Sequence, residues 1–528
     1  MASSIPEYDT NRSKGSGFTL VTKEGVRFNL NRISGTFKLV VRNKMALVGL
    51  ILLVGFVFAA LGAPLLTPYG PNEKVAGVLA QPEWVMNYPD GYYLSKNVVV
   101  PSSSIIASPS DVQSWNLVAS PSTLANIQES YTPNVVSSST SKGSIQLIYS
   151  GQGSATVRLS QTFQFPYHGP PEDFLATVKY LVTNSSLPSP VHVSLFVERQ
   201  QPIVQDFYLP LHTSQLPNGN QIGVDANDTG SKSWYPPVSL IINGKSPAVE
   251  SFLGTSTSFL PSSIIFSDSG SYSFGLQVTF YGPGKVNVDD MQFELFGTAW
   301  GILGTDYAGV DVYTQFIYGA RISLLVGLLS AGIGISLGLV VGLLAGFLGK
   351  YVDEVLMRFT DMMLVIPGLP LLIVLVAVLG PNIWNLIIVI GFLGWMGFAR
   401  IVRSQVLTIR ERPFVEASRA SGAGTGRIIV KHIFPNLVSL TYVNLALTVP
   451  GAILSESALA FLGLSDPSVV SWGHMFANLQ QSKDLVRFPP VWWWVLPPGL
   501  GIALVSLSFI LIGYALDEIF NPRLRKRR

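Results

Sequence analysis

The sequence predicts a helical membrane protein that carries a large β-rich insertion. The chain has 528 residues, of which 48% are hydrophobic and 12% charged, and a mean hydropathy of +0.40, which is too apolar for a soluble protein of this size. Six apolar segments approach or exceed the roughly 20 residues that a helix needs to cross a bilayer. A long segment of different composition separates the first from the second. We therefore expect an all-α polytopic part and an inserted all-β part.

Each apolar segment is interpreted as one membrane span. The third and fourth are separated only by "GPN" (380–382), which predicts a tight helical hairpin. Prolines inside the fifth and sixth predict kinks, which neighbouring helices can accommodate. The six predicted spans are Met45–Leu66, Ile322–Leu348, Met362–Leu379, Ile383–Ile401, Leu437–Leu464 and Val491–Ala515.

The basic residues predict the orientation of the chain. They gather in the N-terminal tail (1–44), in the loop 402–436 and in the C-terminal tail (521–528), which ends in "RLRKRR". The positive-inside rule places all three in the cytoplasm, which an even number of spans permits. The first apolar segment begins too far into the chain for an ordinary signal peptide and is expected to be retained. We thus expect a multi-pass protein of the cell membrane with both termini inside and residues 67–311 outside.

The outer segment 67–311 alternates between apolar and polar residues, as antiparallel strands do. "SIQLIYS", "SATVRLSQTFQF", "HVSLFVE" and "SYSFGLQVTF" show this period of two and are bounded by turn signals. The segment is predicted to be a β-sandwich or jelly-roll. The glycan acceptor patterns at Asn184 and Asn227 fit an outside location. Five aromatic residues, which either stack on sugars or belong to the core, are Trp115, Tyr131, Tyr167, Trp234 and Tyr235.

Several kinds of site are not expected. The chain has no cysteine, and its five histidines are scattered, so we expect no disulfide, metal site or cysteine chemistry. "GKS" at Gly244–Ser246 lacks the upstream glycine of a phosphate loop, because Ser239 stands there. A net charge of +3 gives no reason to expect a nucleic-acid partner. We expect no catalytic residue and no cofactor held by this chain.

The cytoplasmic loop contains a specific pattern, "FVEASRASGAGTGRIIVKHIFPN" (414–436). Pro413 favours a helix start, Glu416 falls in the first turn, and small residues follow until the glycines end the helix. Such a slim helix can press into a groove on another protein, with Arg419, Arg427 and Lys431 around it. From the residues alone, a solvated loop with an incidental glycine turn is an equal alternative.

The same loop resembles the cytoplasmic signature of importer-type ABC permeases. Glu416, Ala417, Gly422 and Pro435 match that signature, whereas Ser418 stands where alanine is usual. Further stretches, namely "RNKMALVGLILLVGFVFAALGAPLLTPYGPN", "LGTDYAGVDVYTQFIYGARISLLVGLL", "VDEVLMRFTDMMLVIPGLPLL", "AILSESALAFLGL", "SWGHMF" and "NPRLR", are similar to the oligopeptide/dipeptide permease family, second subunit type. Bacterial members lack the large outer segment.

This resemblance implies a type I ABC importer permease fold with six transmembrane helices, in a subunit that is not itself an enzyme. It implies a paired permease subunit, two cytoplasmic ATPase subunits that bind ATP and Mg, an external substrate-binding protein, and a loop helix that seats in an ATPase cleft. The residues expected to couple to the ATPase are Glu416, Ala417, Ser418, Arg419, Gly422 and Pro435. Glu416 is the expected anchor. Gly422 either allows close approach or only stops the helix, and Arg419 either contacts the ATPase or is solvated.

Polar residues within the spans have two interpretations. Asn385, Trp395, Thr441 and Asn444 are candidates to line the substrate pathway. Glu456 would be costly in a membrane unless it is functional or bonded to neighbours such as Ser455 or Ser457, and we favour the bonded role.

Short peptides are the expected substrate, with oligosaccharides as the alternative and nickel less favoured. The outer domain could dock the binding protein, cap the pathway or bind substrate, and "GKVNVDDMQFELFG" resembles the closing strands of jelly-roll carbohydrate-binding modules. Two alternatives come from other classes: a membrane-anchored extracellular binding or surface-layer protein, which would not need the loop motif, and a secondary transporter, which would show ion-coupling charges at the midplane.

Overall fold

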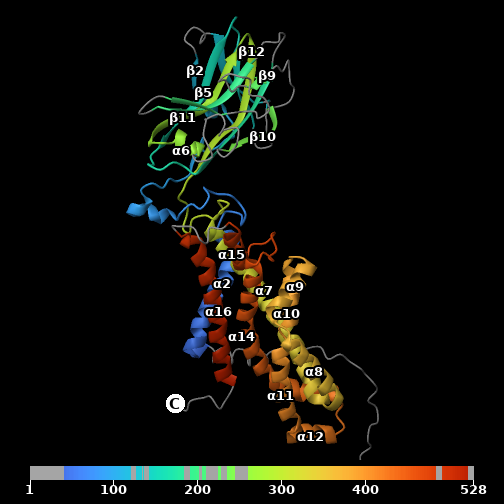
Figure 1. Ribbon diagram of the computed structural model, residues 1–528. Coiled ribbons are helices and arrows are strands. Elements are labelled where there is room, and N and C mark those ends of the chain that lie inside the picture. Colours follow the sequence, from blue (N-terminus) through green and yellow to red (C-terminus); the bar gives the residue numbers. More distant parts are fainter. Residues whose placement is uncertain are drawn as a thin grey trace, which may run out of the picture.

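A helical bundle and a β-sandwich make up the chain, joined by a neck of two chain segments (Figure 1). The structure, a computed structural model, describes residues 41–119, 126–133, 135, 142–183, 191–200, 205–209, 224–226, 235–243, 260–482 and 490–520. The glycan acceptor patterns, the "GKS" turn, Trp234, both basic tails except for a few N-terminal residues, and the side chain of Tyr235 lie outside the described residues.

The β-rich domain consists of two antiparallel sheets. One has the strand order β10-β6-β12-β4-β3 with β1 beside β12, and the other has the order β2-β5-β11-β7-β8 with β9 beside β7. The strands are β1 Val98–Val100, β2 Asn116–Ala119, β3 Ile127–Thr132, β4 Ser144–Tyr149, β5 Ala155–Phe165, β6 Asp173–Thr183, β7 Val191–Arg199, β8 Gln205–Leu209, β9 Val224–Ala226, β10 Tyr235–Asn243, β11 Gly270–Phe280 and β12 Gly284–Phe296.

The predicted β-rich insertion and the four quoted strands are confirmed by this arrangement of two sheets. Side chains of both sheets meet in one core, in which Val157 and Leu159 of β5 and Phe274 of β11 lie with Leu147 and Phe293 of the opposite sheet. Alternate residues of β5 point inward, as the period of two predicts. Two short helices, α4 Pro109–Gln113 and α6 Pro261–Ile265, flank the sandwich.

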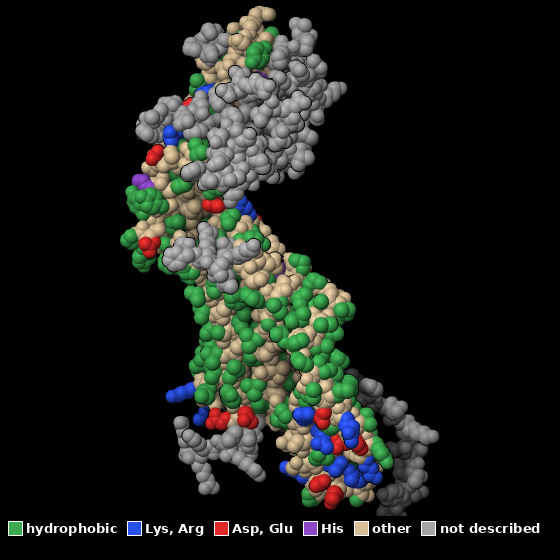
Figure 2. Space-filling model, in the orientation of Figure 1, with side chains coloured by type: hydrophobic (Ala, Val, Ile, Leu, Met, Phe, Trp, Pro, Cys, Tyr) green, Lys and Arg blue, Asp and Glu red, His purple; other side chains and the backbone are tan. Residues whose placement is uncertain are grey.

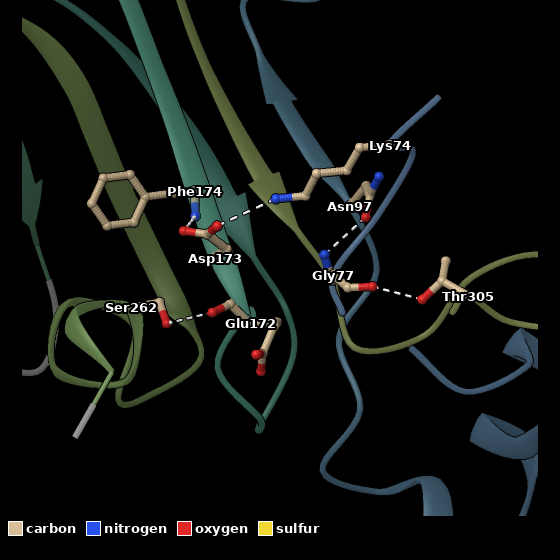
Figure 3. Close-up of polar contacts among 9 residues, drawn as sticks. Lys74, Gly77, Asn97, Glu172, Asp173, Phe174, Ser262 and Thr305 are labelled. Carbon is tan, nitrogen blue, oxygen red and sulfur yellow. Dashed lines mark hydrogen bonds and ion pairs between the residues drawn. The ribbon is translucent and has the colours of Figure 1, made fainter. Parts of the chain in front are cut away.

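The neck consists of residues 67–97 and 297–311, so the strands begin and end well inside the predicted 67–311 domain. Backbone hydrogen bonds join its two arms, among them Gly77 N–H to Gly297 O at 3.0 Å. The buried Thr305 hydroxyl donates to Gly77 O at 2.6 Å (Figure 3). Lys74 reaches Asp173 at the start of β6, with 3.3 Å between Nζ and Oδ2. These contacts seat the sandwich on the bundle.

The bundle consists of long apolar helices and shorter connecting ones. Five are long and apolar enough to cross a membrane, or six if a bent pair counts as one span, among the described residues. The helices of the bundle and the neck are α2 Lys44–Leu61, α3 Ala63–Leu66, η1 Glu83–Asn87, η2 Pro89–Gly91, α7 Val312–Leu348, α8 Lys350–Val365, α9 Gly368–Leu379, α10 Ile383–Leu393, α11 Met396–Arg410, α12 Pro413–Ala420, α13 Thr425–Ile428, η4 Ile429–Ile433, α14 Phe434–Phe461, α15 Trp472–Gln481 and α16 Trp492–Phe520.

The third predicted span is wrong as a single helix. Helix α8 ends at Val365, α9 starts at Gly368, and the two are bent by 88°. Pro367 has no N–H to continue the helix, and it holds Ile366 in an extended conformation. The 12 residues of α9 rise about 18 Å, less than the roughly 30 Å of a bilayer core. The hairpin between α9 and α10 is present as predicted, and α14 and α16 continue through their prolines.

Helices α7 and α11 pack closely along a row of glycines. Gly338, Gly342 and Gly346 recur every four residues on α7, and an added Cβ at any of them would lie 2.7 Å or less from an atom of α11 or of its N-cap residue Trp395. Such small residues let two membrane helices approach each other. Helix α11 is thereby held against the longest helix of the bundle.

Charge is distributed unevenly over the surface. Figure 2 shows hydrophobic side chains over the sides of the bundle, while Lys, Arg, Asp and Glu gather at the end away from the sandwich, where α8, α11 and α12 lie. The predicted orientation, with this end in the cytoplasm, agrees with the distribution and stays a prediction.

Candidate functional site

Helix α12 lies in the loop between α11 and α14, at the end of the bundle opposite the sandwich (Figure 1). Pro413 occupies its first turn, as expected. The helix ends in a Schellman motif: the N–H of Gly422 donates to Arg419 O at 3.0 Å, and that of Ala423 donates to Ser418 O at 3.1 Å. Gly422 has φ of +78°. This backbone conformation explains why glycine stands there within the chain.

One apolar side chain anchors α12 to the bundle. Val415 is fully buried in a cluster with Phe347 at the end of α7 and Val406 on α11. Ile428 and Ile433, which follow the glycine turn, enter the same cluster. The cluster also contains Leu437 of α14, so the loop helix is tied to α7, α11 and α14.

The rest of α12 is turned away from the bundle. Glu416 and Ala417 are exposed, and the Glu416 carboxylate has no hydrogen-bond or ion-pair partner within the described part of the chain. Ser418 is half-buried, and its hydroxyl donates to Phe414 O at 2.9 Å. The Arg419 guanidinium lies 5.8 Å from the centre of the Phe347 ring. Arg419 is thus exposed and also contacts its own bundle, and its contact with an ATPase stays a prediction.

Ion pairs stiffen the same end of the bundle. Arg403 on α11 makes a two-pronged contact with Asp353 on α8, at 2.5 and 2.6 Å. Arg400 pairs with Asp361 along the same two helices. Arg410 donates to Gly346 O at the end of α7 at 3.1 Å. These contacts therefore tie α11, the helix that leads into α12, to both α8 and α7.

The path from α12 to α14 includes a turn of π-helix, η4, before the exposed Pro435. Asn436 donates to His432 O across this junction at 2.7 Å. Turns of this type are rare and often mark functional sites. Sequence reasoning had no signal for it.

Two parts of the chain match known protein families, and one of them includes this site. Residues 338–526 match the binding-protein-dependent transport system inner membrane component, and residues 36–82 match the N-terminal TM domain of oligopeptide transport permease C. A putative peptide permease protein of Brucella suis biovar 1 is 36% identical over 245 residues, which are 46% of this chain and 79% of that protein. The chain belongs to the oligopeptide and dipeptide permease family of ABC transporters.

Another relative of this permease is the dipeptide transport system permease protein DppC of Bacillus subtilis. It is 40% identical over 224 residues, which are 42% of this chain and 69% of that protein. The two family matches leave residues 83–337 outside them. The solved structure of TmCBM61 in complex with beta-1,4-galactotriose covers 34% of this chain and 88% of that chain, with 9% identity and a TM-score of 0.21. A TM-score this low supports no conclusion about the sandwich.

The four pathway candidates of this permease have different surroundings. Trp395 is buried, and its ring stacks on Phe359 with 6.2 Å between the centres. Asn385 donates to Leu379 O at 2.9 Å and so stabilises the hairpin turn. Thr441 and Asn444 are half-buried on α14 and donate to carbonyls one turn earlier in the same helix.

Glu456 of α14 is buried and bonded to serine hydroxyls. Ser471 donates to its Oε1 at 2.6 Å, and Ser457 contacts Oε2 at 3.4 Å. The bonded role is therefore confirmed, whereas Ser455 bonds within its own helix instead. Ser471 also accepts the N–H of His474 and so caps α15. Sequence reasoning missed Ser471, because its partner lies 15 residues away.

Three of the five aromatic residues that were candidates to stack on sugars lie in or against the core of the sandwich. Trp115 is buried in the core, and Tyr131 and Tyr167 pack against it. The Tyr131 hydroxyl donates to Ala107 O at 2.9 Å. No group of three or more His, Cys, Asp or Glu suited to a metal ion occurs in the described part of the chain.

Proposed function

We propose that this permease is the membrane subunit of an ABC importer that moves short peptides, delivered by an external binding protein, into the cell. It pairs with a second permease subunit, and two separate ATPase subunits supply the energy. The relatives named above are described as peptide and dipeptide permeases, and this supports the choice of substrate. The sandwich faces the outside, and α12 faces the cytoplasm.

The observation that carries the proposal is the division of α12 into two faces. Buried Val415 fixes the helix to the bundle, while exposed Glu416 and Ala417 leave the opposite face free for a neighbour. A helix held on one side and open on the other is a suitable lever. When the ATPase subunits close on ATP, they would move both permeases as rigid bodies and switch the side on which the pathway opens.

Three parts of the loop would share this coupling. Glu416 supplies a charge that has no partner among the described residues, Ala417 and Ser418 keep the helix slim, and Gly422 ends it so that the chain can return to α14. Within the membrane, we retain Thr441 and Asn444 as pathway candidates because they are half-buried. Buried Trp395 and turn-capping Asn385 are better explained by packing.

Reconstitution of the full transporter in liposomes tests the coupling role. Charge-assisted hydrogen bonds are worth about 1.5–3 kcal/mol, so Glu416→Ala should weaken ATPase binding about ten- to hundredfold and lower substrate-stimulated ATP hydrolysis. The matched control is Glu354→Gln, which removes an exposed carboxylate of α8 and should leave coupling unchanged. Equal coupling in both variants would contradict the assigned role of α12.

Uptake assays test the substrate separately. Liposomes that contain the complete transporter and its binding protein should accumulate labelled short peptides when ATP is inside with the ATPase subunits. Uptake of oligosaccharides without peptides would show that the peptide assignment is wrong while the importer assignment stands. Normal function of the chain without any ATPase subunit would support the membrane-anchored binding protein instead.

A further inference from the structure

We propose that the segment Glu83–Tyr93, here called the aromatic ledge, lies in the lipid headgroup layer beside the bundle and steadies the β-sandwich on the membrane. The ledge comprises the short helices η1 and η2 and the two tyrosines that follow. The proposal depends on the membrane location of α2 and α16. It does not depend on the transported substrate or on α12.

The ledge exposes its largest side chains and buries smaller ones. Val85 and Leu94, just past its end, pack with Ala299 of the opposite arm of the neck. The side chains that point away are aromatic and exposed: Trp84 by 46%, Tyr88 by 60%, Tyr92 by 56% and Tyr93 by 72%. Four neighbouring exposed aromatic residues form an apolar patch of the kind that marks an interaction site.

This patch continues the lipid-facing surface of the bundle. The Trp84 ring lies 5.6 Å from that of Trp492, the first residue of the membrane helix α16. Its indole N–H donates to the carbonyl of exposed Ile302 at 3.1 Å. Leu66, at the end of α3, lines the same open cavity as Ile302 and is exposed as well. Figure 2 shows hydrophobic side chains on the left side of the neck, at a height between the sandwich and the apolar bundle.

The chemistry of the ledge suits a bilayer interface better than a protein partner. Tryptophan and tyrosine are enriched where a membrane meets water, since the ring is apolar and its N–H or O–H stays hydrated. Asn87 and Asp90, which are exposed between the aromatic residues, would face the hydrated headgroups. The ledge adjoins helices that lie in lipid, and we therefore infer that the bilayer, and not a protein partner, covers its exposed aromatic residues.

The ledge also contacts the sandwich directly. The Tyr92 ring stacks on His168, which precedes β6, with 4.6 Å between the ring centres and 14° between the planes. A ledge fixed in the headgroup layer would therefore hold both the neck and the base of the sandwich. The sandwich would keep one orientation over the opening of the pathway instead of swinging freely.

Spin labels test the location of the ledge in the full chain reconstituted in liposomes. The chain has no cysteine, so Tyr88→Cys and Tyr93→Cys each give one labelled site. Tyr281→Cys is the matched control. Tyr281 is exposed and lies in the turn between β11 and β12, at the end of the sandwich opposite to the neck. Oxygen, which partitions into lipid, and a water-soluble nickel chelate are then compared as collision partners.

The ratio of oxygen to nickel collisions should be several-fold higher at positions 88 and 93 than at position 281. Ratios equal to that of the control would overturn the proposal. Protection from both reagents that arises only when a second permease or a binding protein is added would overturn it too, since the ledge would then be a protein contact. Loss of peptide uptake in other variants bears on the transport proposal alone.

Discussion

The close packing of α7 against α11 predicts a strong effect from one added methyl group. In Gly342→Ala, the new Cβ would lie 2.5 Å from the carbonyl oxygen of Ala399 and 2.6 Å from the Cβ of Val402. Ordinary contact begins at 3.4 Å, so α11 would have to move by about 0.9 Å. Both neighbours are fully buried, which leaves no flexible side chain to absorb the shift.

The expected size follows from two opposing terms. Overpacking costs about 1–3 kcal/mol, whereas alanine in place of glycine within a helix gains about 0.5–1 kcal/mol. Gly342→Ala should therefore lower the free energy of unfolding by about 1–2 kcal/mol. Because α11 leads into α12, the variant should also weaken coupling to the ATPase.

Gly332→Ala is the matched control on the same helix. A Cβ at Gly332 would meet no atom within 4 Å, so this variant should be as stable as the natural chain or slightly more stable. Both variants are to be unfolded by heat and by SDS titration in mixed micelles. If Gly342→Ala proves as stable as Gly332→Ala, the argument from close helix packing is wrong.

Three further predictions concern the neck and the end of the bundle that lies next to it. Ser471→Ala removes the bond to Glu456 and the cap of α15, and it should cost about 1–3 kcal/mol in thermal unfolding, whereas Ser455→Ala, which loses only a hydrogen bond within its own helix, should cost little. Thr305→Val keeps the shape but leaves two backbone groups of the neck unpaired. It should cost about 2 kcal/mol and speed proteolysis between sandwich and bundle; unchanged proteolysis would contradict the role of the neck. Burial lowers the pKa of His474, so the unfolded chain binds its proton more readily than the folded chain. Stability should therefore fall as the pH drops below about 6.5, and His474→Gln should flatten that part of the pH profile.

Local patterns in the sequence were sufficient for the elements of this protein. Runs of apolar residues located the long helices, and the period of two located β4, β5, β7 and β11. Pro413 and Gly422 marked the two ends of α12, because the start and the stop of a helix depend on backbone conformation at single residues. Motif order along the chain was also sufficient for the family.

Only the tertiary structure decided which residues meet. The sequence contains Pro367, but only the structure shows the 88° bend between α8 and α9 and the ion pair of Arg403 with Asp353 that joins α11 to α8. Trp395 turned out to be buried, and Glu456 found its main partner across a loop, in Ser471. The hydropathy of a residue predicts that its side chain is buried, but it does not predict which residues the side chain contacts. That choice depends on the packing of whole helices and sheets, because each contact joins segments that are distant in the sequence.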